Sequence, residues 1–206
     1  ITQEADGLSS GFRRCSNASY IAALMSRIGV TDIRTIVVPD DIRQLTRTLV
    51  ELDAVCDVII TVGGTGKGKR DYTRQAVSDA GGVFVGHDTQ LDSPFVTARL
   101  PHAGLIGLPG NPLAVMMIVQ CVLLESVRSV FHLPEAPAQT VEAVMTEDIE
   151  AGICGELCVN VNESAAKPLI KGTGRMRVFD SARGFVRLNG QGIKRGERVR
   201  VELFRN

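Results

Sequence analysis

Aromatic residues are scarce in this chain of 206 residues, making up 4% of it, and tryptophan is absent. Proteins that bind single-stranded nucleic acid stack bases on aromatic side chains, so the scarcity argues against that class. An excess of either charge is also lacking, because 23 Lys and Arg residues balance 23 Asp and Glu residues. Neither nucleic acid nor a membrane surface is therefore predicted as a partner.

Disulfide-forming and membrane-spanning patterns are absent as well. The five cysteines are odd in number and irregular in spacing, which does not describe a disulfide framework. Cys154 and Cys158 lie four apart without a second pair to complete a zinc site. No signal peptide is visible, and no apolar run reaches the ~18 residues of a membrane span. We predict reduced thiols and a cytoplasmic location. Because the chain opens at Ile1-Thr2 without methionine, we interpret it as part of a longer protein.

Apolar runs alternate with helical patterns from the N-terminus to about Leu133. The patterns predict helices over 17–29, 40–51, 71–80 and 111–132, and strands over 34–38, 55–62, 83–85 and 105–108. Such alternation predicts an α/β fold with a parallel sheet covered by helices on both faces. Ligands of these sheets bind at the carboxyl ends of the strands.

The character of the sequence changes after a linker at 132–137. Short strands separated by glycine turns are predicted over 140–146, 156–161, 184–188 and 197–204. The last of them alternates apolar and charged residues, as a half-buried strand does. We therefore predict two domains, an α/β domain over 1–137 and a small β domain over 138–206.

A glycine-rich turn follows the buried strand 55–62, where residues 63–71 read GGTGKGKRD. Bare backbone N–H groups can approach an anion closely at such a turn, and the neighbouring cations add attraction. A phosphate-loop NTPase is disfavoured, because Arg70 stands where that motif needs a hydroxyl for magnesium. We predict a turn that binds an anionic, phosphate-bearing ligand and is formed by Gly63, Gly64, Thr65, Gly66 and Gly68.

Three acids, Asp40, Asp41 and Asp71, stand at predicted helix starts near the same edge of the sheet. Carboxylates gathered beside a phosphate site can hold Mg²⁺. Each acid alone can equally be a helix cap, and both interpretations stay open.

Two further segments lie where a strand or loop meets a helix. Pro109-Gly110-Asn111-Pro112 either binds ligand or forms a rigid turn with Asn111 as helix cap. Ser16-Asn17 presents the same two alternatives at the start of the first predicted helix.

Taken together, these motifs resemble the molybdenum-cofactor biosynthesis proteins of the MogA and MoeA (gephyrin-like) families. Val58 to Gly66, followed by Arg70-Asp71-Tyr72-Thr73, is similar to their molybdopterin-binding domain. The residues of these two motifs are closer to those of MogA. Gly107 to Pro112 and Val38-Pro39-Asp40-Asp41 are closer to MoeA. Lys171 to Gly174, Gly184 to Arg187 and Ile193 to Val199 are similar to the C-terminal β domain of MoeA.

The resemblance implies a three-layer α/β molybdopterin-binding fold, with a mostly parallel sheet, followed by a small β-barrel-like domain. It implies molybdopterin or adenylylated molybdopterin as ligand, Mg²⁺ as cofactor, and a homodimer. MoeA-type enzymes insert molybdate into adenylylated molybdopterin and release AMP, whereas MogA-type enzymes adenylylate molybdopterin. By position, Asp40 and Asp71 match catalytic acids, while the pterin and phosphate cradle matches residues 63–66 with Pro109, Gly110 and Asn111.

The sequence also departs from the MoeA pattern. Thr2-Gln3-Glu4-Ala5-Asp6 replaces the family's Gly-Asp-Glu-Leu, and two alternatives stay open: Glu4 or Asp6 substitutes for the family's acid, or no residue does. Gln90 to Pro94 replaces Lys-Pro-Gly-Lys-Pro and removes two cations that would assist a polyanionic ligand. Three hypotheses therefore stay open: a MoeA-like molybdotransferase, a non-catalytic molybdopterin-binding paralogue, and a MogA-like adenylyltransferase.

Overall fold

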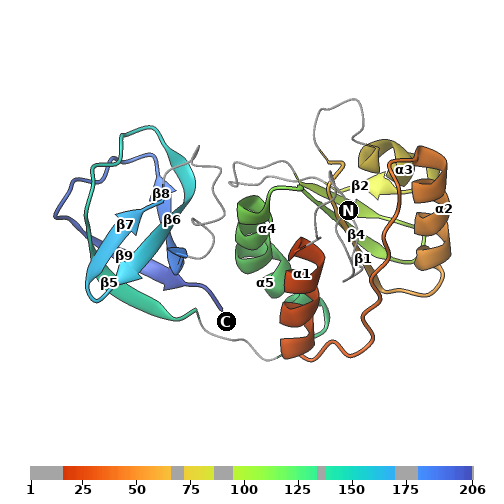
Figure 1. Ribbon diagram of the computed structural model, residues 1–206, viewed down its shortest axis with the longest axis horizontal. Coiled ribbons are helices and arrows are strands. Elements are labelled where there is room, and N and C mark those ends of the chain that lie inside the picture. Colours follow the sequence, from red (N-terminus) through yellow and green to blue (C-terminus); the bar gives the residue numbers. More distant parts are fainter. Residues whose placement is uncertain (1–15, 66–71, 86–94, 134–137, 170–180, 206) are drawn as a thin grey trace, which may run out of the picture. The chain divides into compact units, whose positions relative to one another are not determined.

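The computed structural model describes residues 16–65, 72–85, 95–133, 138–169 and 181–205. The described chain forms two compact units, the first ending at Val115 and the second beginning at Met116. Figure 1 shows helices around a sheet in the first unit and a β-barrel in the second. Each unit is described by itself below.

The first unit contains three helices and a four-stranded sheet. The helices are α1 (Ser16–Arg27), α2 (Ile42–Asp53) and α3 (Thr73–Asp79), and the strands are β1 (Val58–Val62), β2 (Val83–Phe84), β3 (Val96–Arg99) and β4 (Gly104–Leu108). Their order in the sheet is β1-β4-β3-β2. Strands β1 and β4 are parallel, whereas β3 is antiparallel to both β4 and β2. The α/β fold is as predicted, but the described sheet is mixed rather than mostly parallel.

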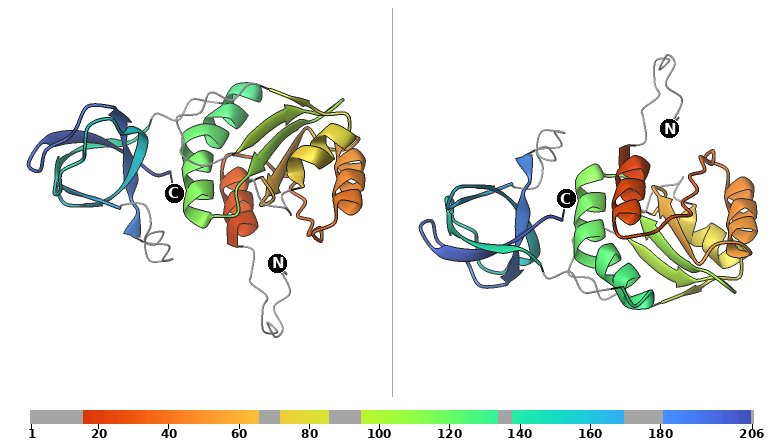
Figure 2. Two further views of the ribbon diagram at one scale, coloured as in Figure 1. Left: turned by 90° about the horizontal axis from the view of Figure 1, so that it is seen from above. Right: turned by 90° about the horizontal axis from the view of Figure 1, so that it is seen from below.

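Helices cover both faces of this sheet. Figure 2 shows α2 and α3 on one face and α1 on the other. Leu49 of α2, Val77 of α3 and Leu105 of β4 belong to one apolar core, and each is at most 1% exposed. Burial of such side chains contributes about 1.5–3 kcal/mol each. The apolar periodicity of the helices therefore gives the three layers that the sequence predicted.

Strand assignments differ from the predictions at three places. The segment 34–38, predicted as a strand, has no regular structure, and Ile36 and Val37 are 53% and 50% exposed. Strand β3 and strand β7 (Ala165–Pro168) were not predicted. A strand forms only where a partner edge is available, so short apolar runs do not report it by themselves.

One long helical stretch runs from Pro112 to Val130. It consists of α4 (Pro112–Ile118), a π-helical turn η1 (Val119–Leu123) and α5 (Leu124–Val130), where the sequence predicted a single helix. By length and composition alone it could cross a membrane, although no apolar run of that length was expected from the sequence. Half of it is buried inside the fold, and a core helix of a soluble protein meets the same criterion.

The second unit contains a closed five-stranded barrel. Its strands are β5 (Thr140–Met145), β6 (Cys154–Asn162), β7, β8 (Gly184–Asn189) and β9 (Arg198–Leu203), in the order β5-β7-β6-β8-β9. Alternate side chains point inward, and Met145, Val159 and Val201 are fully buried in the barrel core. The barrel-like domain implied by the resemblance is confirmed.

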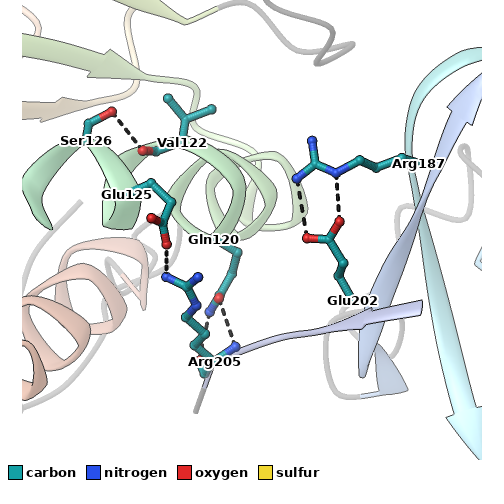
Figure 3. A network of polar contacts seen from close by, with 7 residues as sticks. All are labelled: Gln120, Val122, Glu125, Ser126, Arg187, Glu202 and Arg205. Atoms are coloured by element: carbon teal, nitrogen blue, oxygen red, sulfur yellow. Dashed lines mark hydrogen bonds and ion pairs between the residues drawn. The ribbon is translucent and has the colours of Figure 1, made fainter. Parts of the chain in front are cut away.

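The C-terminal segment is attached to the helix within this unit (Figure 3). The amide nitrogen Nε2 of Gln120 donates to the carbonyl oxygen of Arg205 at 2.9 Å, and the backbone N–H of Arg205 donates to Oε1 of Gln120 at 3.0 Å. The guanidinium of Arg205 also pairs with Glu125. The side-chain amide of Gln120, which lies in the π-helical turn, thus makes the same pair of donor and acceptor bonds to the backbone of Arg205 that a neighbouring strand would make.

Glu156 provides a prediction about pH. Its side chain is 6% exposed, its Oε1 lies 3.7 Å from Nη1 of Arg187, and its buried Oε2 has no described partner. Burial raises the pKa of this carboxyl above its usual range, against the opposing attraction of Arg187. The folded state therefore holds the proton more tightly than the unfolded state, and stability falls as pH rises from the unfolded pKa through the folded one.

Relative to Glu156→Gln, we expect the wild type to lose stability over that range. Urea unfolding of both proteins at a series of pH values measures the difference. A difference in unfolding free energy that does not change with pH would contradict the assignment.

Candidate functional site

The turn after β1 is built on two consecutive glycines with left-handed backbone angles. Gly63 has φ of +88° and Gly64 has φ of +69°, which side chains other than glycine rarely adopt. The N–H of Gly63 donates to the carbonyl oxygen of Leu108 at 2.8 Å, so the turn begins in register with the end of β4. The glycines therefore reverse the chain at the carboxyl end of β1 and β4, the only parallel strand pair in the described sheet of the first unit.

Thr73, the first residue of α3, holds this turn from the protein side. Its backbone N–H donates to the carbonyl oxygen of Gly64 at 3.1 Å, and its Oγ1 donates to the carbonyl oxygen of Gly63 at 3.2 Å. Thr65 and Thr73 are each 2% exposed. The turn is thus a packed part of the fold, with two of its carbonyl groups directed inward.

The Pro109-Gly110 turn and the start of α1 meet the glycine turn. Nδ2 of Asn17 donates to the carbonyl oxygen of Gly110 at 3.2 Å, and Asn17 is 8% exposed. A Cβ atom added to Gly110 would lie 3.9 Å from Cα of Gly63. Pro109 is buried and Gly110 is exposed. The structure therefore brings together three segments that the sequence analysis selected separately.

Two of the selected polar residues are helix caps. Oδ1 of Asp41 accepts from the N–H of Gln44 at 2.9 Å at the start of α2. Oδ1 of Asn111 accepts from the N–H groups of Leu113 at 2.9 Å and Ala114 at 3.3 Å. These contacts match the capping alternative for both residues, and such caps stabilise a helix by about 1 kcal/mol. Ser16 and Asp40 are exposed at the starts of α1 and α2.

Several selected residues lie outside the described part of the chain: Glu4, Asp6, Gly66, Gly68, Asp71, Gln90 and Ser93. Within the described ranges, no group of three or more His, Cys, Asp or Glu side chains could hold a metal ion. The described residues thus include the glycine turn but do not themselves compose a Mg²⁺ site.

Gly107 is a part of the site to which the sequence assigned no role beyond membership of the motif from Gly107 to Pro112. A Cβ atom there would lie 3.0 Å from Cγ2 of Thr65, 3.2 Å from Oγ1 of Thr61 and 3.3 Å from Cγ2 of Thr73. Three threonine side chains therefore close over the bare Cα of Gly107. No role could be predicted for Thr73 either. Its hydrogen bonds to the glycine turn form only in the folded chain.

Fold and site together define an α/β protein with a glycine turn at the edge of its sheet and an appended β-barrel. A family described as a probable molybdopterin binding domain matches residues 5–129. The chain belongs to this family, and it is a MoeA-like member of the molybdenum cofactor biosynthesis proteins.

Its relatives among characterised proteins are distant. A molybdopterin molybdenumtransferase from Haemophilus influenzae is 26% identical over 111 residues, covering 53% of this chain and 28% of the relative. A CinA-like protein from Desulforapulum autotrophicum is 35% identical over 112 residues, covering 54% of this chain and 26% of the relative. The chain thus spans less than a third of the length of these relatives.

A solved structure titled molybdopterin biosynthesis MoeA protein, from Pyrococcus horikoshii, matches the fold with a TM-score of 0.83 and 21% identity. The match covers 98% of this chain and 51% of that one. Both the α/β unit and the barrel are therefore present as in MoeA.

Proposed function

We propose that this chain binds adenylylated molybdopterin and forms the ligand-binding half of an enzyme that inserts molybdate into it, releasing AMP. The glycine turn over 63–65, braced from within by Thr73, carries the proposal. Its backbone can approach a phosphate closely, and it lies against Gly110 at the sheet edge where ligands of α/β proteins bind. We further propose that the protein works as a homodimer in the cytoplasm.

The appended barrel favours insertion over adenylylation. The MoeA-titled structure that covers 98% of the chain contains both parts, so the whole architecture is of the MoeA kind. The Gly-Gly-Thr-Gly motif of the turn and the Arg70-Asp71-Tyr72-Thr73 segment are closer to MogA, and they keep adenylylation as a second candidate. The replaced lysines at 90–94 keep a non-catalytic binding protein as a third.

Magnesium would neutralise the pyrophosphate of the adenylylated ligand. We propose Asp40 and Asp71 as its ligands, because both match acids of the family pattern. Asp41, also predicted as a ligand, uses Oδ1 to cap α2. The described residues alone do not compose the site, so no step of the reaction is derived through the metal. What they do supply is orientation of the phosphate end of the ligand.

The test is a release assay on the purified chain. Adenylylated molybdopterin, molybdate and Mg²⁺ are mixed with it, and AMP is measured by chromatography. AMP released in proportion to protein supports insertion. Tight binding without AMP leaves two explanations, an isolated ligand-binding half and the non-catalytic alternative, whereas pyrophosphate released from ATP and molybdopterin supports adenylylation. Absence of binding to either form of molybdopterin would overturn the proposal.

Asp71→Ala is expected to abolish AMP release, because the carboxylate proposed to hold Mg²⁺ is lost, while leaving the thermal unfolding midpoint unchanged. Asp79→Ala is the matched control. Asp79 is the last residue of α3, and its Oδ1 accepts from Nε2 of Gln75 at 2.7 Å on the surface. AMP release by Asp71→Ala at the wild-type rate would contradict the assignment of this acid.

A further inference from the structure

Thr73 contributes two donors to two consecutive carbonyl groups of the glycine turn. Its N–H reaches the oxygen of Gly64 at 3.1 Å and its Oγ1 reaches the oxygen of Gly63 at 3.2 Å. Helix α3 has no side-chain cap from Tyr72. The carbonyl oxygen of Gly64 instead accepts the N–H of Thr73, the first residue of the helix. One buried residue therefore determines the orientation of two adjacent peptide groups.

The orientation of those carbonyls fixes the N–H groups that follow them. In a trans peptide the C=O of one residue and the N–H of the next point in opposite directions. Because the oxygens of Gly63 and Gly64 both face Thr73, the N–H groups of Gly64 and Thr65 face away from it. A backbone N–H that points outward from a glycine turn can approach an anion closely.

Gly107 allows this arrangement. With no side chain at Gly107, the methyl groups of Thr65 and Thr73 come within 3.0 Å and 3.3 Å of the place that its Cβ would occupy. The glycine turn can therefore settle onto β4, and the hydroxyl of Thr73 remains close to the oxygen of Gly63.

From this geometry we propose that Thr73 is a positioning residue for phosphate recognition, and that the N–H of Gly64 is the donor that meets the phosphate of the ligand. The inference rests on the proposed function for the identity of the ligand. It adds which atoms of the turn receive the phosphate and which side chain aims them. Without the hydroxyl, the peptide between Gly63 and Gly64 is free to rotate, and its N–H no longer has a fixed direction.

A simpler role for Thr73 is to stabilise α3 alone. Both roles lower stability when the hydroxyl is removed, so stability cannot separate them. Only the positioning role changes how the amide of Gly64 responds to phosphate. The test therefore compares Thr73→Val, which keeps the branched shape but loses the hydroxyl, with Thr73→Ser, which keeps the hydroxyl and loses the methyl group.

The first measurement is an NMR titration of the ¹⁵N-labelled chain with inorganic phosphate. In the wild type and Thr73→Ser, the amide signal of Gly64 is expected to shift on titration. In Thr73→Val, well below its unfolding temperature, that shift is expected to be lost. A Gly64 signal that shifts equally in Thr73→Val, or one that does not respond in the wild type, would overturn the inference.

The second measurement compares binding of molybdopterin with binding of molybdopterin whose phosphate has been removed by a phosphatase. Thr73→Val is expected to bind the phosphorylated form roughly ten-fold more weakly than the wild type, since a hydrogen bond to a charged group is lost or misdirected. Its affinity for the dephosphorylated form is expected to be unchanged.

Equal losses for the two ligands would overturn the inference while leaving the proposed function intact. Failure of the wild type to bind either ligand would contradict the proposed function instead, and the phosphate titration would still decide the role of Thr73.

Discussion

Replacing Asp53 by alanine is expected to lower the free energy of unfolding by about 2–4 kcal/mol, because two backbone donors lose a charged acceptor. Asp53 ends α2 and is 7% exposed. Its Oδ1 accepts from the N–H of His102 at 3.0 Å and from the N–H of Ala103 at 2.8 Å. Ala103 is fully buried, so its N–H would be left without water or protein as a partner.

The position of this carboxylate explains why the effect is large. The two bonds hold the tight turn that leads into β4, and the N–H of Leu100 closes the same turn by donating to the oxygen of Ala103 at 2.9 Å. Strand β4 in turn carries Gly107 and the Pro109-Gly110 turn to the site. A loss at Asp53 therefore affects the element that supports the glycine turn.

Asp53→Asn is the matched control, because it keeps one carbonyl oxygen in a side chain of nearly the same shape and replaces the other oxygen with an uncharged NH₂ group. We expect it to cost about 1 kcal/mol. Urea unfolding followed by circular dichroism measures both variants. Similar stabilities of Asp53→Ala and the wild type would show that the turn does not depend on the carboxylate.

Nothing in the sequence around Asp53 indicates this role, and the reason is general. Its two partners lie about fifty residues further along the chain, and only the folded sheet brings them together. By contrast, helices α1 and α2 could be predicted, because their apolar spacing and capping residues are local. Local signals thus located most elements, whereas long-range hydrogen bonds could not be inferred.

The glycine turn was predictable for a similar reason, and its bracing was not. Gly63 and Gly64 follow a buried apolar strand, so the sequence already implies a sharp turn with accessible N–H groups. Which carbonyls turn inward depends on Thr73, which returns to the turn only after residues 66–71. For Asp41 and Asn111 the sequence left the cap and ligand alternatives open, and the contacts now seen are those of caps.

The segment 34–38 was predicted as a strand and has no regular structure. Its run of β-branched residues is typical of a strand, yet Ile36 and Val37 are half exposed and unpaired in the described structure. The short strand β3 was missed although Val96 and Ala98 are buried and alternate with Thr97 and Arg99. Strand propensity therefore identified a candidate, while burial against a neighbouring strand decided the outcome.

The barrel should be the most sensitive to a single methyl group at Gly184. Strands β8 and β9 pair only at Gly184 with Leu203 and at Phe185 with Glu202, so these two pairs close the barrel. A Cβ atom at Gly184 would collide with the backbone oxygen of Glu202 and lie 2.9 Å from Cγ1 of Val201. Neither can yield easily, because one is backbone and the other is fully buried.

Gly184→Ala is therefore expected to destabilise the second unit by about 3 kcal/mol, the upper end of what overpacking usually costs. The N–H of Phe204, which donates to the oxygen of Arg183 at 2.9 Å beside the closing pairs, should lose its protection from hydrogen exchange. Gly104→Ala is the matched control, since the nearest atom to its added Cβ, the oxygen of Asp57, is 3.9 Å away. Calorimetry and hydrogen exchange on both variants measure the effect. If Gly184→Ala and Gly104→Ala unfold at the same temperature with equal protection of Phe204, the barrel does not depend on close contact between β8 and β9.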